Sequence, residues 1–112
     1  MMVGARTPED LETFLEDALL MRCDGALADL FTEDAVLAVE HRSPARGRWE
    51  AARLAMATWE SDHSYVASPL RVVQSRDLAL VVSSHCINVA RRNAAGDWQY
   101  VIVLQRDEKD VS

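Results

Sequence analysis

The chain has 112 residues, the size of one folded domain and too short for two domains that each bury a core. Apolar residues make up 49% and charged residues 27%, a balance typical of folded proteins rather than disordered ones. The net charge is -6, and residues 1–41 hold ten acidic residues against Arg6 and Arg22. This acidity argues against a nucleic-acid partner, because binding phosphate needs a basic patch.

The cysteines and histidines give no sign of a metal or cofactor site. Cys23 and Cys86 are far apart and match no metal-binding spacing, so we expect two reduced thiols in an intracellular protein. The three histidines lack ligand spacing, and no glycine-rich phosphate loop is present, so we expect no metal and no cofactor. No apolar run has the length of a signal peptide or of a membrane span, roughly 20 residues. We expect a cytoplasmic protein with no membrane partner.

Two helices are predicted in the first third of the chain. Thr7 suits a helix N-cap, Pro8 the first helical position, and Asp10 completes a capping box. The spacing behind them predicts an amphipathic helix with Leu11, Phe14, Leu15, Ala18, Leu19 and Arg22 inside and Glu9, Glu12, Glu16 and Asp17 outside. A second, shorter helix is predicted from Asp24, as its cap, to near Phe31.

The middle of the chain predicts a strand, a loop and a third helix. Residues 32–34 suit a turn and residues 35–40 a short strand. Pro44 and Gly47 make residues 41–48 a loop, with room for one brief strand pairing. A helix is predicted from residue 49 to about 62, and its apolar stripe contains Trp49, Ala52, Met56 and Trp59, or alternatively Arg53, Met56 and Trp59.

From residue 64 the pattern changes to the period of a strand. Residues 75–77 suit a turn, and residues 78–92 are extended over about 50 Å, so a bend near Ser83 and Ser84 is expected. Residues 93–97 suit a hairpin with Gly96 in a left-handed conformation. Alternation in the last strand, 98–106, predicts one face with Trp98, Tyr100, Ile102 and Leu104 and another with Gln99, Val101, Val103 and Gln105. Both faces are partly apolar, so we expect a homodimer through the outer sheet face.

This order of elements, ααβαβββ, resembles the nuclear-transport-factor-2-like (NTF2-like) superfamily, which includes SnoaL-like polyketide cyclases and ketosteroid isomerases. Residues 29–36, DLFTEDAV, resemble its "LF-x-[DE]-D-A" turn into the first strand. Residues 89–101, VARRNAAGDWQYV, are similar to the "V-x-R-R-x-x-D-G-x-W" hairpin of bacterial SnoaL-like members. The resemblance implies a single α+β domain over residues 1–112, a cone in which three helices pack on a curved antiparallel sheet and leave a hollow for a small molecule.

The chain departs from this resemblance in one segment. Members usually carry another hairpin before the one with the paired arginines, but here only ten residues separate Leu80 from Arg91. Either the sheet has lost strands, or residues 78–92 bend sharply and serve as two strands.

The resemblance also places the residues of a ketosteroid isomerase, which needs a carboxylate base facing a tyrosine and a neutral aspartic acid. Val39 stands at the position of the base and Glu16 near that of the tyrosine, and neither suits its role. Asn88 stands at the position of the neutral acid, where its amide could donate a hydrogen bond but could not transfer a proton. We therefore do not expect steroid isomerisation.

His41 and Glu40 are the candidate catalytic residues, because they follow Val39 directly. His41 shares strand parity with Val39, so it would point inward if the strand continued, and a histidine there could act as a general base at neutral pH. The alternative is that the strand ends at Glu40 and both side chains contact solvent.

A second group of candidates would line a ligand pocket. These residues are Phe14, Met56, Trp59, Tyr65, His85, Asn88 and Val101. Core packing is the alternative for the aromatic members. His85 and Asn88 cannot share a strand face without a bulge between them, and the resemblance favours Asn88.

The leading hypothesis is a dimeric protein that binds a small, mostly apolar metabolite in a cavity of roughly 300 Å³ or more. We expect the cavity to open near Glu40, His41 and Asn88. One alternative is a non-catalytic association module whose cone is a packed core. The other is an isomerase or cyclase with its general base at His41 or Glu40.

Overall fold

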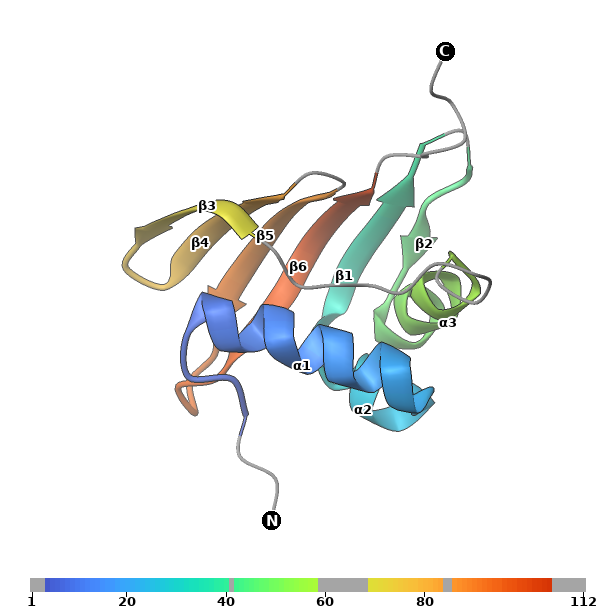
Figure 1. Cartoon of the computed structure of the whole chain (residues 1–112), viewed down its shortest axis with the longest axis horizontal. Coiled ribbons are helices and arrows are strands. Elements are labelled where there is room, and N and C mark those ends of the chain that lie inside the picture. Colours follow the sequence, from blue (N-terminus) through green and yellow to red (C-terminus); the bar gives the residue numbers. More distant parts are fainter. Residues whose placement is uncertain (1–3, 41, 59–68, 84–85, 106–112) are drawn as a thin grey trace.

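The protein is an α+β structure in which helices pack against one face of a curved, unclosed mixed sheet (Figure 1). The computed structural model describes residues 4–40, 42–58, 69–83 and 86–105. The elements are α1 (Pro8–Met21), α2 (Asp24–Ala28), β1 (Phe31–Val39), β2 (Ala45–Arg46), α3 (Arg48–Thr58), β3 (Pro69–Ser75), β4 (Leu78–Ser83), β5 (Cys86–Arg92) and β6 (Trp98–Gln105). The expected fold class is confirmed, with two more strands than the predicted order contained.

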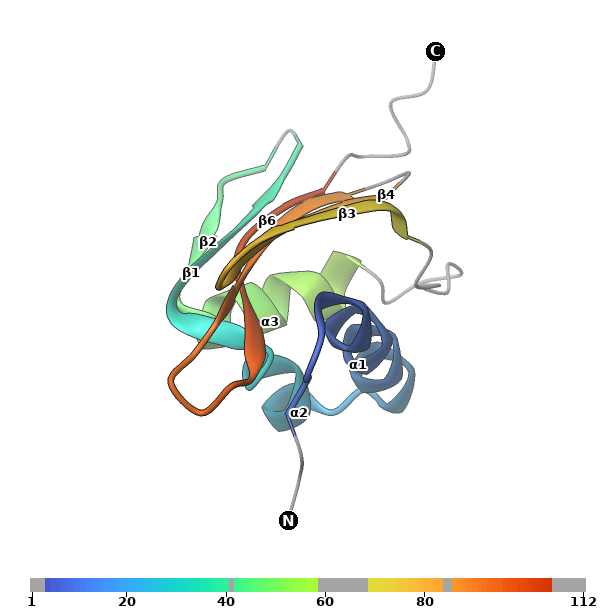
Figure 2. The same ribbon diagram turned by 90° about the vertical axis from the view of Figure 1, so that its left-hand side faces the viewer.

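The strands lie in the order β2-β1-β6-β5-β4-β3, and Figure 2 shows the helices together on one side of the curved sheet. All neighbouring strands are antiparallel except β1 and β6, which are parallel. The expectation of a purely antiparallel sheet is therefore wrong at this pairing. Parallel neighbours need a long connection rather than a hairpin, and here α3 and four other strands separate β1 from β6 along the chain.

Helix α1 begins as its sequence predicts. The Thr7 side-chain oxygen accepts a hydrogen bond from the Asp10 N–H at 3.0 Å, and Pro8 is the first helical residue. Arg22 ends the helix in a left-handed conformation, with φ at 52°. Its predicted place on the inner helical face is therefore wrong, because the helix stops before it and Arg22 is exposed.

The second helix is shorter than predicted and the first strand is longer. Asp24 is the first residue of α2 and Cys23 is its N-cap, whereas Asp24 was the predicted cap. Phe31 opens β1, so the predicted turn at residues 32–34 belongs to the strand. The pairing of β1 with β6 shifts register between Phe31 and Val36, and this irregularity takes up the polar residues that resemble a turn.

Residues 78–92 form two strands joined by a sharp reversal. Strands β4 and β5 pair antiparallel, with Val81 opposite Asn88. The Ser83 hydroxyl accepts from the Cys86 N–H and donates to the Cys86 carbonyl, both at 3.2 Å, which ties the two strand ends together. Ser84 lies outside the described residues. Of the two alternatives, lost strands or one segment that serves as two strands, the second is therefore correct.

A bulge in β6 changes which of its side chains face the helices. Val89 pairs with Ile102 but Ala90 pairs with Tyr100, so Val101 is an extra residue. A one-residue slip moves every later side chain to the other face. The two faces predicted for β6 are therefore wrong beyond Val101. The buried face consists of Trp98, Tyr100, Val103 and Gln105, while Ile102 and Leu104 are each 46% exposed.

Helix α3 packs on β1 and α2 through small side chains. Its buried residues are Ala51, Ala52 and Ala55, whose methyl groups allow the helix to approach closely. Neither predicted stripe is correct as a whole, because Trp49 is 56% exposed and Arg53 is exposed as well. The largest fully buried side chains, among them Trp98, Tyr100 and Phe31, lie between the sheet and the helices.

Candidate functional site

Three polar side chains meet inside the core between α1 and the concave face of the sheet. They are Glu12 of α1, which is 1% exposed, and Asn88 of β5 and Tyr100 of β6, which are both 0% exposed. The Asn88 Nδ2 group donates to Glu12 Oε2 at 3.1 Å, and the Tyr100 hydroxyl donates to the same oxygen. We call Glu12, Asn88 and Tyr100 the buried polar cluster.

The burial of Glu12 contradicts its predicted place on the outer side of the first helix. The inner face of α1 includes Pro8, Leu15 and Leu19, and Glu12 completes their spacing of four, three and four residues. Glu12 therefore lies on the same stripe as these apolar residues. This spacing in the sequence indicates that Glu12 is buried. The opposite prediction was favoured because a carboxylate is so rarely buried.

Hydrogen bonds make this burial tolerable. A carboxylate taken out of water costs several kcal/mol unless it is paired or hydrogen-bonded. Asn88 and Tyr100, which donate to Glu12, come from the sheet and lie 76 and 88 residues away in the sequence. A carboxyl oxygen accepts hydrogen bonds, and Glu12 Oε2 accepts from two donors. The cluster therefore fixes α1 over β5 and β6.

Two buried amide oxygens beside this cluster, Asn88 Oδ1 and Gln105 Oε1, have no hydrogen-bond partner in the described part of the chain. Gln105 is 3% exposed and lies on the same buried face of β6 as Tyr100. In folded proteins nearly all buried polar atoms have a partner, so each exception needs an explanation. Sequence reasoning identified Asn88 as a pocket residue but missed Glu12, Tyr100 and Gln105 as parts of a polar site.

The remaining candidates for the pocket wall lie in different places. Met56 is half-buried on α3 and packs against the core, and Val101 is half-buried at the β6 bulge. Trp59, Tyr65 and His85 lie outside the described residues.

Of the candidate catalytic residues, Glu40 directly follows β1, which stops at Val39. Glu40 is exposed, and its backbone N–H donates to the Gln105 carbonyl at 3.1 Å. His41 lies outside the described residues.

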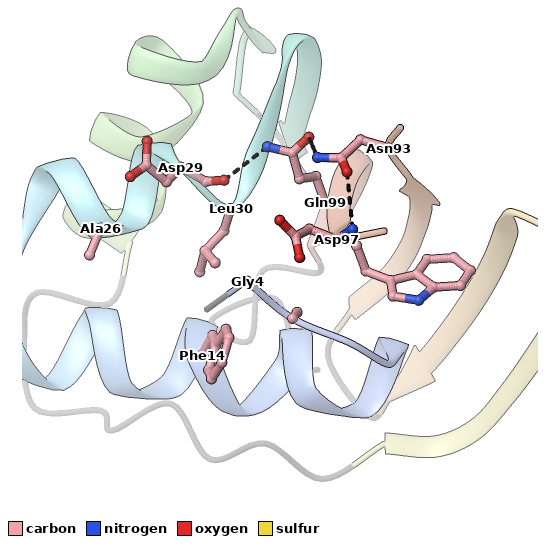
Figure 3. A pocket seen from close by; sticks show the side chains of 10 residues that line it. Gly4, Phe14, Ala26, Asp29, Leu30, Asn93, Asp97 and Gln99 are labelled. Carbon is pink, nitrogen blue, oxygen red and sulfur yellow. Dashed lines mark hydrogen bonds between the residues drawn. The ribbon is translucent and has the colours of Figure 1, made fainter. Parts of the chain in front are cut away.

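Phe14 lines a pocket of about 250 Å³ that lies between α1, α2 and the β5–β6 hairpin, away from the buried polar cluster (Figure 3). Its polar wall is tied together by hydrogen bonds: Asn93 Nδ2 donates to Gln99 Oε1 at 3.3 Å, and Gln99 Nε2 donates to the Asp29 carbonyl at 3.0 Å. Asp97 lies 3.8 Å from the guanidinium of Arg6. These contacts join the hairpin to the helical layer.

Within the described ranges, no three histidine, cysteine or acidic side chains are placed to hold a metal ion. Cys23 is exposed and Cys86 is buried. None of the helices in this part of the chain has the length and apolar character of a membrane span.

No protein-family model matches the chain, and no curated protein matches it. Solved structures do match it. A candidate calcium/calmodulin-dependent protein kinase type II association domain from Thiobacillus denitrificans has a TM-score of 0.74 at 14% identity and covers 94% of this chain and 98% of its own. A ketosteroid isomerase-like protein from Erwinia carotovora atroseptica gives 0.68 at 23% identity, over 88% and 91% of the two chains. An NTF2-like protein from Novosphingobium aromaticivorans gives 0.67 at 19% identity, over 93% and 81%.

These likenesses show that the chain has the NTF2-like fold, as the resemblance of its sequence implied. Their identities are too low to carry an activity, and the proteins differ in role, one being assigned to association and another likened to an isomerase. One fold hosts many functions, so function has to be argued from the site.

Proposed function

We propose that this protein binds a small molecule against the concave face of its sheet, with the buried polar cluster at the inner end of the site. The observation that carries the proposal is that Asn88 and Tyr100, from two strands, both donate to one carboxylate oxygen of Glu12 on α1. Ligand sites are mostly apolar and contain a few converging polar groups that orient the ligand. The cluster would supply these polar groups.

The surroundings of the cluster supply the apolar part. Asn88 lies between Val81 on β4 and Val103 on β6, which are its direct cross-strand neighbours and are both buried. Ala90 follows on the same face of β5 and lies opposite Tyr100. A ligand with a hydrocarbon body and one polar head would suit this surface, because its head could reach the cluster while its body contacts the valines.

We propose binding without a reaction. The position that the resemblance gives to a catalytic base is held by Val39, which is buried at 5% exposure and cannot accept a proton. Glu40, the candidate base among the described residues, is exposed beyond the strand end. An isomerase or cyclase therefore has less support here than a binding protein.

Thermal unfolding in the presence of rigid ring compounds, each with one polar head, tests this proposal. A ligand at 100 times its dissociation constant stabilises the folded state by about 2.7 kcal/mol, so binding compounds should raise the unfolding midpoint. The Glu12→Gln variant should lose most of that increase. Glu9→Gln, the same change at an exposed position one turn earlier, should keep it. Equal midpoint increases in both variants would contradict the proposal.

A second candidate function is self-association through the outer sheet face. Six apolar side chains there are between 38% and 51% exposed: Val73, Leu78, Leu80, Ile87, Ile102 and Leu104. They come from four adjacent strands, and Val73 pairs with Leu80 while Ile87 pairs with Leu104, so they form one continuous surface. An apolar patch of this kind marks an interaction site, and we propose a second copy of this chain as the partner.

A further inference from the structure

The two unpaired amide oxygens lie on the same concave face of neighbouring strands. Asn88 faces Val103 across the β5–β6 ladder, and Cys86 faces Gln105, so Asn88 and Gln105 are diagonal neighbours. Such residues have backbones roughly 7–8 Å apart. Both oxygens are buried, so a single small group could contact the two of them only after neighbouring side chains move apart.

The orientation of the Asn88 amide follows from its contact with Glu12. The amide NH₂ can only donate, and it points at the Glu12 carboxylate oxygen. Turning the amide over would place its oxygen against a carboxylate oxygen, two acceptors with no hydrogen between them. Asn88 Oδ1 is therefore held as an acceptor, directed away from Glu12 and buried without a donor.

As the structure places them, two acceptors face a ligand at this site: Asn88 Oδ1, fixed by the contact of its amide with Glu12, and Gln105 Oε1. An anionic head would add further acceptors and a repelling charge. A hydroxyl carries one donor and brings lone pairs of its own, whereas a primary ammonium carries three donors and no acceptor. The net charge of -6 also favours the approach of a cation.

On the basis of the proposed function, we propose that the ligand carries a primary ammonium head group, held by Asn88 Oδ1 and Gln105 Oε1 next to Glu12. The hydrocarbon body of this amine would lie against Val81 and Val103, which flank Asn88 on the same buried face. Gln105 would then be a residue that determines the specificity of the site for this ligand class.

Calorimetric titration with matched probes tests the head group. The probes are three hydrocarbon bodies, benzyl, cyclohexylmethyl and 2-naphthylmethyl, each as the primary amine, the alcohol and the trimethylammonium salt. The trimethylammonium head has the charge but no N–H donor. We expect at least one amine to bind about ten-fold more tightly than its alcohol and its trimethylammonium salt, a difference of about 1.4 kcal/mol.

The outcomes separate this inference from the proposed function. Alcohols that bind as well as their amines would overturn the ammonium head group and leave the binding function standing. Trimethylammonium salts that match the amines would show that charge alone is recognised and would also overturn it. If no member of the panel binds, both proposals are wrong.

The Gln105→Met variant tests the residue, because methionine keeps the length of the side chain and removes the acceptor. We expect the preference for amine over alcohol to fall about five-fold or more, while Gln74→Met, an exposed position on β3, leaves it unchanged. An unchanged preference in Gln105→Met would overturn the role of Gln105. In the unaltered protein, the side-chain amide NMR signals of Asn88 and Gln105 should shift on adding the amine and not on adding the alcohol, and unmoved signals would overturn the inference.

Discussion

At the scale of single residues, the protein contains two kinds of buried polar atom with opposite consequences for stability. Glu12 Oε2 accepts from Asn88 and Tyr100, so removing either donor leaves a buried carboxylate less well compensated. Within the described residues no group donates to Gln105 Oε1, so replacing the Gln105 side chain breaks no hydrogen bond to that oxygen. Stability measurements can distinguish these two situations.

The first prediction concerns the hydroxyl of Tyr100. Tyr100→Phe should lower the free energy of unfolding by about 2 kcal/mol, because a buried acceptor that loses its donor costs about 1–3 kcal/mol. Urea unfolding followed by circular dichroism measures the change. An unchanged free energy would mean that the hydroxyl does not stabilise the Glu12 carboxylate.

The second prediction concerns Gln105 in the protein without ligand. Gln105→Met should leave the free energy of unfolding unchanged or raise it by about 1 kcal/mol, since a buried acceptor without a donor costs about 1–3 kcal/mol. The same urea titration applies. A loss of stability as large as that of Tyr100→Phe would show that Gln105 is a structural residue and that its oxygen is satisfied within the fold.

Sequence reasoning predicted part of this site, and the part that it missed has a physical cause. Asn88 was identified because the resemblance assigns a functional position to it. Glu12 was placed outside, although its spacing from Pro8 and Leu15 fits the inner stripe. Its burial depends on donors from β5 and β6, and no local pattern in the first helix reveals them.

At the scale of elements, the features that depend on neighbouring residues were predictable. The Thr7 cap, the turn at residues 75–77 and the left-handed Gly96 were all expected from the local sequence, and all are present. The bulge at Val101 and the parallel pairing of β1 with β6 were not expected. They arise from how distant strands pair, so the local alternation of residues could not indicate them.

A pair of glycine substitutions tests the conformations of these elements. Gly96 has φ at 90°, so Gly96→Ala should destabilise the protein by about 1 kcal/mol. Gly25 lies inside α2 with no atom within 4 Å of an added methyl group, so Gly25→Ala should stabilise it by about 0.5–1 kcal/mol. Thermal unfolding compares the two variants. Effects of the same sign would contradict the assigned conformations.

At the scale of the whole molecule, the two faces of the sheet suit different tasks. The concave face, covered by the helices, carries the buried polar cluster and Gln105. The outer face carries the exposed apolar surface of β3 to β6. A protein with this arrangement could associate through one face and bind a ligand on the other, so the two proposed functions are compatible.

Self-association can be tested on its own. We expect a mass twice the 12.5 kDa of the chain in light scattering. Leu80→Lys should raise the dimer dissociation constant about ten-fold or more, because a charge would then be buried in an apolar interface. Gln74→Lys, at an exposed polar position on the neighbouring strand β3, serves as the control. A monomeric unaltered protein at high concentration would contradict the proposed dimer.

The most direct test of the binding site is a crystal structure of the protein with the tightest-binding amine of the probe panel. We expect the amine nitrogen within hydrogen-bonding distance of Asn88 Oδ1 and Gln105 Oε1, with the hydrocarbon body against Val103. An amine bound instead in the pocket beside Phe14 and Asp97, with the oxygens of Asn88 and Gln105 untouched, would contradict it.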